Sequence, residues 1–225
     1  EEIAQRTLEV LERAVAKGAE SDPAHGCVGL LQGKYVVVTA GGTQEAIDPV
    51  RYIGNRSSGK FGYAIASAAR AMGACVVLVS GPTNLPCPDG VRRIDVVSAD
   101  DMFQAVDAAF DGADILVCAA AVADYTPVRK ADHKLKKSNE RLDCIELVET
   151  RDILASMSAR KGDRVVVGFA AETDNLIEYA SSKLAFGSDT DKVTWITADG
   201  AEELPCMQKN EAAFEILRRV ALLYR

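Results

Sequence analysis

The sequence has few of the residues that build metal clusters or disulfide frameworks. Among 225 residues there are only two histidines, and none of the six cysteines belongs to a Cys-x-x-Cys pair. Two histidines cannot form a histidine-rich metal centre, and scattered cysteines argue against a zinc site or a disulfide framework. His25 and His133 are the only candidates for histidine acid–base chemistry, and no acidic or nucleophilic residue is spaced around them in a recognisable way.

Long apolar runs are also missing. No stretch approaches the roughly 18 residues that a membrane span needs, and residues 1–10 are charged rather than signal-like. We therefore expect a cytoplasmic protein that does not bind a membrane.

Positive charge is in short supply. The chain has 26 basic and 33 acidic side chains, a net charge of −7. Binding to nucleic acid without sequence specificity needs a surplus of lysine and arginine, so we expect no nucleic-acid partner. Any anion must be held by a local site.

Short apolar, β-branched segments alternate with helical patterns along most of the chain. We expect an N-terminal helix and linker over residues 1–30, and one domain over residues 31–225. The expected strands are 35–39, 75–79, 94–97, 115–118, 165–168 and 193–196. The expected helices are 57–72, 100–110, 172–184 and 209–224. This alternation predicts an α/β fold, a Rossmann-like parallel sheet with helices on both faces.

Ligands of such sheets bind at the carboxyl ends of the strands, near the point where the strand order reverses. Three loops are therefore candidates for the site: residues 41–60, 119–137 and 169–173. The first is long, polar and rich in glycine, which is typical of a functional loop.

The first loop has the features of a phosphate site. Gly41 and Gly42 allow backbone amides to approach a phosphate, and Ser57-Ser58-Gly59-Lys60 opens a helix whose amino end carries partial positive charge. A capped helix with a solvated lysine explains the same residues equally well.

The second loop combines small residues, a carboxylate and lysines. Residues 119–123 are small or apolar and directly follow a strand, so a planar base or a ribose can lie against the backbone. Asp124 comes next, and Lys134, Lys136 and Lys137 follow about ten residues later. A magnesium-binding carboxylate beside lysines suits a triphosphate. A solvated hairpin tip is the alternative for the lysines.

Tyr179 and Lys183 match the Tyr-x-x-x-Lys pair of short-chain dehydrogenases, which suggests an NADPH-dependent reductase as an alternative. That family requires later glycines after the first strand and a serine about a dozen residues before the tyrosine. Residues 39–46 and 165–168 lack these features. We interpret the match as chance.

Six segments in one order resemble a known family. They are TAGGTQEAIDPVRYIGNRSSGKFGYAIA, VSGP, AAAVADY, KLKK, VGFAAET and FGSDTDKVT. Together they closely resemble the phosphopantothenate–cysteine ligases, also called phosphopantothenoylcysteine synthetases, of the bacterial CTP-using type. The likeness covers residues 31–225. In many bacteria this ligase is fused to a flavin-dependent decarboxylase, so a fused or separate phosphopantothenoylcysteine decarboxylase is an implied partner. Residues 1–30 resemble the connecting segment, so no FMN is expected in this chain.

The resemblance implies a step of coenzyme A biosynthesis with CTP and Mg²⁺. The carboxylate of 4′-phosphopantothenate attacks the α-phosphate of CTP, which releases pyrophosphate and forms an acyl-cytidylate. The amine of L-cysteine then displaces CMP. Negative charge develops in both steps, and fixed cations and donors stabilise it.

The resemblance also assigns residues. Lys134 matches the lysine that acts in acyl-cytidylate formation, and Asn55 matches the asparagine that holds the intermediate. Asp124 matches the carboxylate associated with the metal and the nucleotide. The nucleotide-binding positions are Gly41, Gly42, Ser57, Ser58, Cys118, Ala119, Ala120, Asp124, Lys134, Arg151, Asp152, Ile153, Leu154, Phe169 and Lys183.

Family members are homodimers. The resemblance implies a protruding dimerisation hairpin or flap around residues 124–147, and it implies that Arg51 contacts a phosphate in the partner's site. Two departures stand out. The turn Asn-Pro-Asp-Ile of the family reads Thr150-Arg151-Asp152-Ile153 here. The family also has a further lysine, a buried strand and an Asn-Asp turn between Leu184 and Ala185, so we expect a segment to be absent there.

Three functions stay open on the sequence alone: a ligase, an NADPH reductase, and a nucleotide-binding regulatory module without turnover. Pyrophosphate release that requires CTP, phosphopantothenate and magnesium together favours the first. Oxidation of NADPH favours the second, and CTP binding without pyrophosphate release favours the third.

Overall fold

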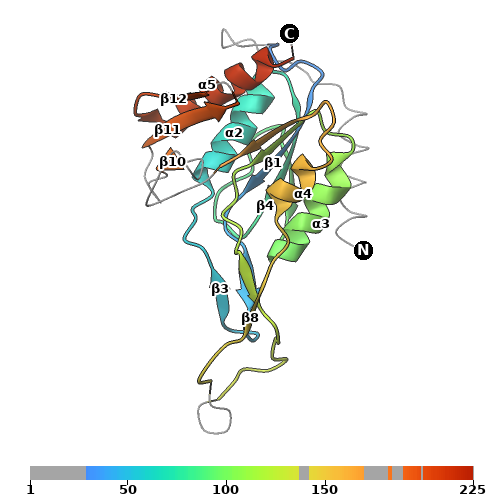
Figure 1. The fold of residues 1–225 in the computed structure, drawn as a ribbon, viewed down its shortest axis with the longest axis vertical. Helices are drawn as coiled ribbons and strands as arrows, with labels where there is room; N and C mark the ends of the chain where they lie inside the picture. The colour runs from blue at the N-terminus through green and yellow to red at the C-terminus, as the bar shows by residue number, and fades with distance from the viewer. Residues whose placement is uncertain (1–28, 137–141, 170–181, 184–189, 199, 225) are drawn as a thin grey trace.

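A five-stranded parallel sheet forms the centre of the protein (Figure 1). The structure is a computed structural model, and it describes residues 29–136, 142–169, 182–183, 190–198 and 200–224. The strand order is β5-β4-β1-β6-β9, and all four pairings are parallel. The strands are β1 (Tyr35–Ala40), β4 (Cys75–Ser80), β5 (Arg92–Asp95), β6 (Ile115–Cys118) and β9 (Val165–Gly168).

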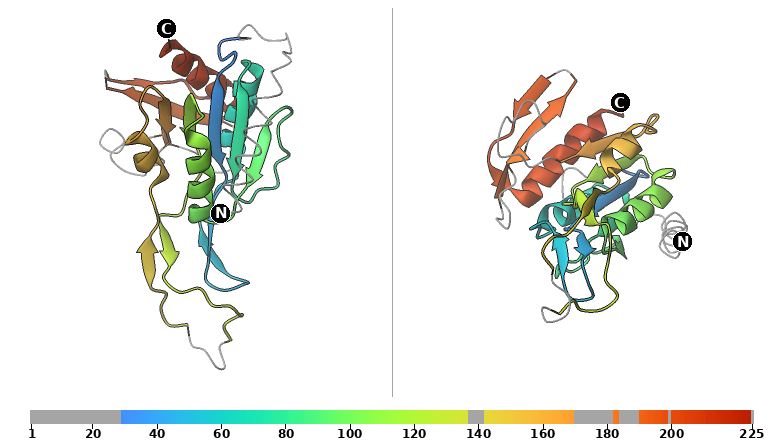
Figure 2. Two further views of the ribbon diagram at one scale, coloured as in Figure 1. Left: turned by 90° about the vertical axis from the view of Figure 1, so that its right-hand side faces the viewer. Right: turned by 60° about the horizontal axis from the view of Figure 1, so that its bottom comes forward.

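Helices cover both faces of this sheet, which confirms the predicted fold class (Figure 2). They are α2 (Lys60–Ala71), α3 (Ala99–Phe110), α4 (Ile153–Ser158) and α5 (Lys209–Leu222). The alternating side chains of β1 enter two cores. Val36 and Val38 pack in the core under α2 and α5, while Tyr35 and Val37 pack in the core under α3 and α4. Because β1 is buried on both faces, its sequence is apolar except for Thr39.

Helix α2 crosses β1 at very close range. A Cβ added at Gly62 would lie 2.5 Å from the Cβ of Ala40 and 2.9 Å from the carbonyl oxygen of Thr39. Only a glycine allows this approach, so Gly62 sets the spacing between the helix and the strand whose carboxyl end points toward the candidate loops.

We predict that Gly62→Ala destabilises the protein by about 2 kcal/mol. Alanine favours a helix over glycine by ~1 kcal/mol. Overpacking a close-packed core costs ~1–3 kcal/mol, and two contacts this short place the cost at Gly62 near the upper end of that range. The overpacking cost therefore exceeds the gain in helix propensity. Urea unfolding measures the change. Ser67→Ala on the exposed side of the same helix is the matched control, expected within ~0.5 kcal/mol of the parent. A Gly62→Ala variant as stable as the parent contradicts this account of the packing.

Helix α2 and strand β5 begin two or more residues away from their predicted starts. Helix α2 begins at Lys60, three residues after the predicted start, because Gly59 at its N-cap has a φ of 75°. A left-handed residue cannot continue a right-handed helix toward Ser57, so Ser57 and Ser58 belong to the loop. Strand β5 covers 92–95 instead of 94–97.

The prediction that residues 193–196 join the parallel sheet is wrong. They belong to β11 (Thr190–Thr197), which pairs antiparallel with β10 (Ser182–Lys183), β12 (Gly200–Glu203) and β13 (Met207–Gln208). Val193 and Trp195, two residues apart, pack on the core, as in a strand with one solvated face. Val193 is buried, and β11 lies beside α5 (Figure 1).

The expected helix over residues 172–184 cannot be compared fully, because residues 170–181 and 184–189 lie outside the described residues. Within it, Ser182 and Lys183 form strand β10 rather than a helix. The expected N-terminal helix also lies outside the described residues. In the described part of the chain, no helix has both the length and the apolar character that crossing a bilayer requires.

Two short ribbons project from the sheet as an arm, which we define as the described residues of 44–54 and 125–149 (Figures 1 and 2). One ribbon pairs β2 (Gln44–Ala46) with β3 (Tyr52–Gly54), and the other pairs β7 (Tyr125–Pro127) with β8 (Leu147–Glu149). Strand β2 lies beside β7. The arm covers the stretch expected to form a flap.

Candidate functional site

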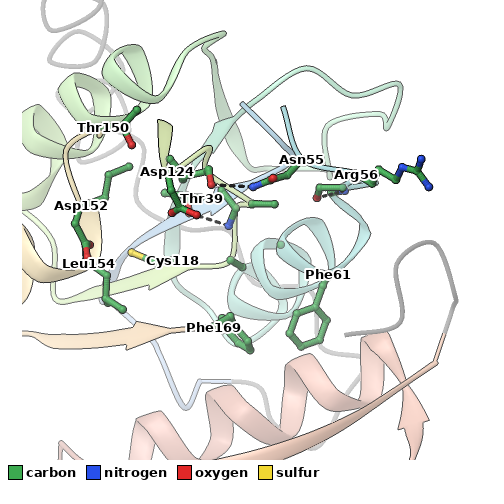
Figure 3. A pocket seen from close by; sticks show the side chains of 18 of the residues that line it. Thr39, Asn55, Arg56, Phe61, Cys118, Asp124, Thr150, Asp152, Leu154 and Phe169 are labelled. Carbon is green, nitrogen blue, oxygen red and sulfur yellow. Dashed lines mark hydrogen bonds between the residues drawn. The ribbon is translucent and has the colours of Figure 1, made fainter. Parts of the chain in front are cut away.

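A cavity of about 760 Å³ lies at the carboxyl edge of the sheet (Figure 3). From β1 the chain proceeds to β4 and β5 on one side, whereas β6 and β9 lie on the other, so the strand order reverses between β1 and β6. Thr39 of β1 and Cys118 of β6 both line the cavity. The cavity therefore occupies the position where sheets of this type bind ligands.

Twelve of the seventeen predicted site residues line this cavity. They are Asn55, Ser57, Ser58, Cys118, Ala119, Ala120, Asp124, Arg151, Asp152, Ile153, Leu154 and Phe169. They come from four separate segments of the chain. The fold brings these segments together at the carboxyl edge of the sheet, as expected from the positions of the candidate loops.

The amino end of α2 forms one wall. Gly59, Lys60, Phe61 and Gly62 line the cavity with the two serines before them. The backbone N–H of Gly59 donates to the Ser57 hydroxyl at 3.3 Å. The first turn of α2 has no acidic residue. A helix start of this kind offers N–H groups and partial positive charge to an anion.

Gly41 and Gly42 lie beside the cavity rather than in its lining. The N–H of Ala121 donates to the carbonyl of Gly41 at 2.8 Å, so this loop pairs with the chain after β6. A Cβ at Gly42 would lie 2.9 Å from the carbonyl oxygen of Asn55. In this structure the two glycines bring the walls of the cavity together, and their contact with a phosphate stays a prediction.

Side-chain hydrogen bonds fix the chain that follows β6. The N–H of Ala120 donates to the Thr39 hydroxyl at 3.1 Å, and the Asn55 amide Nδ2 donates to the carbonyl of Val122 at 2.9 Å. The Asn55 amide thus lies between the loops that follow β1 and β6, at the mouth of the cavity (Figure 3).

The turn at residues 150–154 forms the opposite wall. The Asp152 carboxylate caps α4 by accepting from the N–H of Ala155 at 2.8 Å, and the Thr150 hydroxyl donates to the carbonyl of Ala123 at 2.7 Å. The Arg151 guanidinium forms an ion pair with Asp100 and lies 3.7 Å over the Phe103 ring. These contacts hold the turn against the chain after β6 and against α3.

Two aromatic rings form an apolar wall of the cavity. Phe61 of α2 and Phe169 after β9 meet edge to face, with ring centroids 5.1 Å apart (Figure 3). An aromatic surface suits a planar base. The combination of an apolar wall and a helix start can receive a molecule that has an aromatic part and an anionic part.

Burial raises the pKa of Cys118 to about 12, and the nearby Asp152 carboxylate adds to the rise. The thiol is therefore protonated at neutral pH, and its role in the cavity is that of a small neutral group.

We predict that Cys118 resists iodoacetamide at pH 8, where only about one thiol in ten thousand with such a pKa is ionised. The labelling rate of Cys118 should rise with pH, because the thiolate forms as the pH approaches the pKa of about 12. Cys206 is exposed and lies outside the arm, so it serves as the internal reference. Peptide mass spectrometry after timed labelling measures both sites, and equal labelling rates for the two at pH 8 contradict the prediction.

Two further predicted residues do not line the cavity. Lys134 is exposed on the arm, and Arg51 is held there by Asp48. Lys183 lies in β10, and its role as a nucleotide contact stays a prediction. Tyr179, its partner in the reductase alternative, lies outside the described residues, and β10 does not keep the helical spacing which that pair needs.

The cavity also includes residues that the sequence analysis did not assign. Arg56, Lys60, Tyr125, Glu149 and Lys209 line it, and Lys209 is only 7% exposed. Lys60 belongs to a quoted motif and could have been selected from it. Lys209 begins α5, about 150 residues away, and only the packing of α5 beside α2 brings it to the site.

The described residues contain no group of three or more histidine, cysteine or acidic side chains that could hold a metal ion by themselves. Asp124 is exposed at the cavity and can supply a single carboxylate. This arrangement fits Mg²⁺ that arrives with a nucleotide, because Mg²⁺ commonly takes one or two carboxylates together with substrate phosphates.

The fold and the site define a Rossmann-like α/β domain with a cavity at the switch point of its sheet. A family model described as the DNA/pantothenate metabolism flavoprotein C-terminal domain matches residues 31–186. The chain belongs to this family.

Named relatives agree with this result. The coenzyme A biosynthesis bifunctional protein CoaBC of Bacillus subtilis (strain 168) is 44% identical over 229 residues, which cover 93% of this chain and 56% of the relative. The CoaBC protein of Escherichia coli (strain K12) is 40% identical over 210 residues, covering 84% and 52%. The chain spans about half the length of the curated relatives it matches. The 229 aligned positions outnumber the 225 residues here, so the Bacillus relative has residues without a counterpart in this chain.

Solved structures show the same fold. The C-terminal domain of a CoaBC protein is 41% identical with a TM-score of 0.75, and the match covers 87% of this chain and 98% of that one. A Cab2 mutant in complex with phosphopantothenate-cysteine is 14% identical with a TM-score of 0.74, covering 99% and 94%. At that identity the second likeness concerns the fold alone.

Proposed function

We propose that the chain is a phosphopantothenate–cysteine ligase that uses CTP and acts in coenzyme A biosynthesis. The observation that supports this most is the cavity itself, where twelve predicted residues from four segments meet at the switch point of the sheet. The relatives are coenzyme A biosynthesis proteins, and one structural neighbour was solved with phosphopantothenate-cysteine, the product of such a reaction.

In this proposal the cavity activates a carboxylate. The carboxylate of 4′-phosphopantothenate attacks the α-phosphate of CTP, the bond from that phosphorus to the bridging oxygen breaks, and pyrophosphate leaves. The amino end of α2, with Ser57 and Ser58, faces the phosphates, and the rings of Phe61 and Phe169 face the apolar part of the nucleotide. Lys134 neutralises charge on the triphosphate during the attack.

The second half-reaction needs a donor at the acyl carbon. The cysteine amine attacks the acyl carbonyl, a tetrahedral centre forms, and CMP leaves as the amide forms. The Asn55 amide stands at the mouth of the cavity, and it is the group proposed to hold the acyl-cytidylate. Hydrogen-bond donors placed where charge develops lower the barrier for such a step.

Mg²⁺ would share the charge of the triphosphate when the nucleotide is bound. Asp124 is the residue proposed to hold the ion, together with phosphate oxygens of CTP. Arg151, by contrast, is engaged with Asp100, so its contribution to the nucleotide turn is through the backbone.

We propose further that the protein is a homodimer joined through the arm. Seven of the thirteen exposed large apolar side chains in the described part of the chain lie on the arm: Val50, Tyr52, Tyr125, Val128, Leu142, Leu147 and Val148. Such a concentration is typical of a surface that another chain covers. Lys134 and Arg51 lie on the same arm, so a dimer would bring them toward a second cavity. Sedimentation at micromolar concentration tests this, and a monomer there contradicts it.

The reaction itself is tested by following pyrophosphate. Release should require CTP, 4′-phosphopantothenate and Mg²⁺ together, and phosphopantothenoylcysteine should appear only when L-cysteine is added. Release that does not depend on phosphopantothenate contradicts the proposal. CTP binding without turnover supports the regulatory module instead, and NADPH oxidation supports the reductase.

A further inference from the structure

Asp48 is an acidic side chain that the proposed reaction does not use, yet it is 2% exposed and fully engaged. It lies in the turn between β2 and β3, on the arm. One carboxylate oxygen accepts from the backbone N–H groups of Val50 and Arg51, both at 2.8 Å. The other accepts from Nε of Arg51 at 2.9 Å and from its Nη2 at 2.5 Å. The turn is therefore closed around an ion pair whose carboxylate is buried and whose guanidinium is partly exposed.

This ion pair also binds the other segment of the arm, residues 125–149. The N–H of Leu135 donates to the Asp48 carboxylate at 3.3 Å, and Nη2 of Arg51 donates to the carbonyl of Leu135 at 3.1 Å. Both backbone polar groups of Leu135 are thus bound by one acid–base pair, as a neighbouring strand would bind them. A further backbone bond, from the N–H of Ala131 to the carbonyl of Ile47 at 3.0 Å, ties the same two segments together.

The Asp48 carboxylate is ionised at neutral pH. Hydrogen bonds from the Arg51 side chain hold the pKa of Asp48 well below its usual range, burial opposes this, and the N–H groups of Val50, Arg51 and Leu135 lower it further. An ionised acceptor and an ionised donor form stronger hydrogen bonds than neutral groups do. Leu135 is therefore held by two charge-assisted bonds, on a segment that has no helix or ladder of its own.

Leu135 is the residue next to Lys134. We infer that Asp48 is a positioning residue for Lys134: together with Arg51 it fixes the backbone at Leu135 and so sets where the lysine ammonium group reaches. This inference rests on the proposed function, because it takes Lys134 as the lysine of the first half-reaction. A lysine has a long flexible side chain, so its backbone must be held in place for the ammonium charge to meet the triphosphate. Misplacing such a group by about 1 Å can cost ~10²-fold in rate.

Asp48→Asn tests the inference, since it keeps the shape of the side chain and removes its charge. Hydrogen–deuterium exchange should become faster in residues 131–136 and stay unchanged in β1 and β4. The rate of pyrophosphate release at saturating CTP should fall by about 10²-fold, with little change in the KM for CTP. Asp132→Asn is the matched control. It makes the same substitution at an exposed position three residues before Leu135, and it should change neither the hydrogen–deuterium exchange nor the rate of pyrophosphate release.

A double variant separates positioning from a merely structural role. If Asp48 acts through Lys134, then Asp48→Asn should lower pyrophosphate release in the parent and have no further effect on the residual rate of Lys134→Gln. Equal losses in both backgrounds overturn the inference, as does unchanged exchange in residues 131–136. If Asp48→Asn also unfolds β1 and β4, Asp48→Glu, which keeps the charge, is judged by the same two criteria.

The outcomes also distinguish this inference from the proposed function. Normal pyrophosphate release by Lys134→Gln removes the catalytic role of that lysine, and with it the positioning role of Asp48, while faster exchange would still show that Asp48 holds the segment. Loss of release in Lys134→Gln with unchanged exchange and full activity in Asp48→Asn overturns the inference alone.

Discussion

Replacing Lys134 by glutamine should abolish the first half-reaction. Pyrophosphate release should fall by about 10²–10³-fold, the loss that follows removal of one strong stabilising group from a site where charge develops. Glutamine keeps most of the length of the side chain and removes the ammonium charge, so the effect reports electrostatics rather than shape. Because Lys134 is exposed on the arm and does not line the cavity of its own chain, stability to urea should not change.

The measurement is single-turnover release of pyrophosphate with CTP, phosphopantothenate and Mg²⁺. Lys130→Gln is the matched control, an exposed lysine on the same segment that should retain the parent rate. A Lys134→Gln variant with normal release would exclude this lysine from the mechanism.

Changing Asn55 to aspartate should separate the two half-reactions. Pyrophosphate release in a single turnover should stay close to the parent value, whereas formation of phosphopantothenoylcysteine should fall by about 10²–10³-fold. Aspartate has the same shape as asparagine but cannot donate from its carboxylate, and its charge opposes negative charge at the acyl carbon. It also loses the bond from Nδ2 to the carbonyl of Val122. The acyl-cytidylate should therefore accumulate and be recovered from quenched reactions.

Asn84→Asp provides the control, since it makes the same change at an exposed position outside the cavity. Parallel loss of pyrophosphate release and amide formation in Asn55→Asp would contradict the assigned role. In that case Asn55 serves the geometry of the loops after β1 and β6, which its bond to Val122 already connects.

The central sheet was predictable because its strands are buried on both faces. The segments of β1 and β4 are mostly apolar and rich in valine, and the order of strand and helix then determined which loops meet at one edge. The start of α2 was not predictable from composition, since Ser57 and Ser58 can begin a helix and only the left-handed Gly59 places them in the loop.

Elements that depend on distant contacts escaped sequence reasoning. The strands of the arm have three residues each, too short for a periodic pattern. Strand β11 was assigned to the wrong sheet because its pairing with β12 depends on residues that follow it. Lys209 reached the cavity only through the packing of α5, and the bonds from Asp48 and Arg51 to Leu135 join residues more than 80 positions apart.

The arm begins and ends at the rim of the cavity. Asn55 follows the last residue of β3, Tyr125 is the first residue of β7, and Glu149 is the last residue of β8, and all three line the cavity. Both ribbons are therefore continuous with the wall of the site. A molecule bound on the arm is linked to that wall through the backbone of β3, β7 and β8.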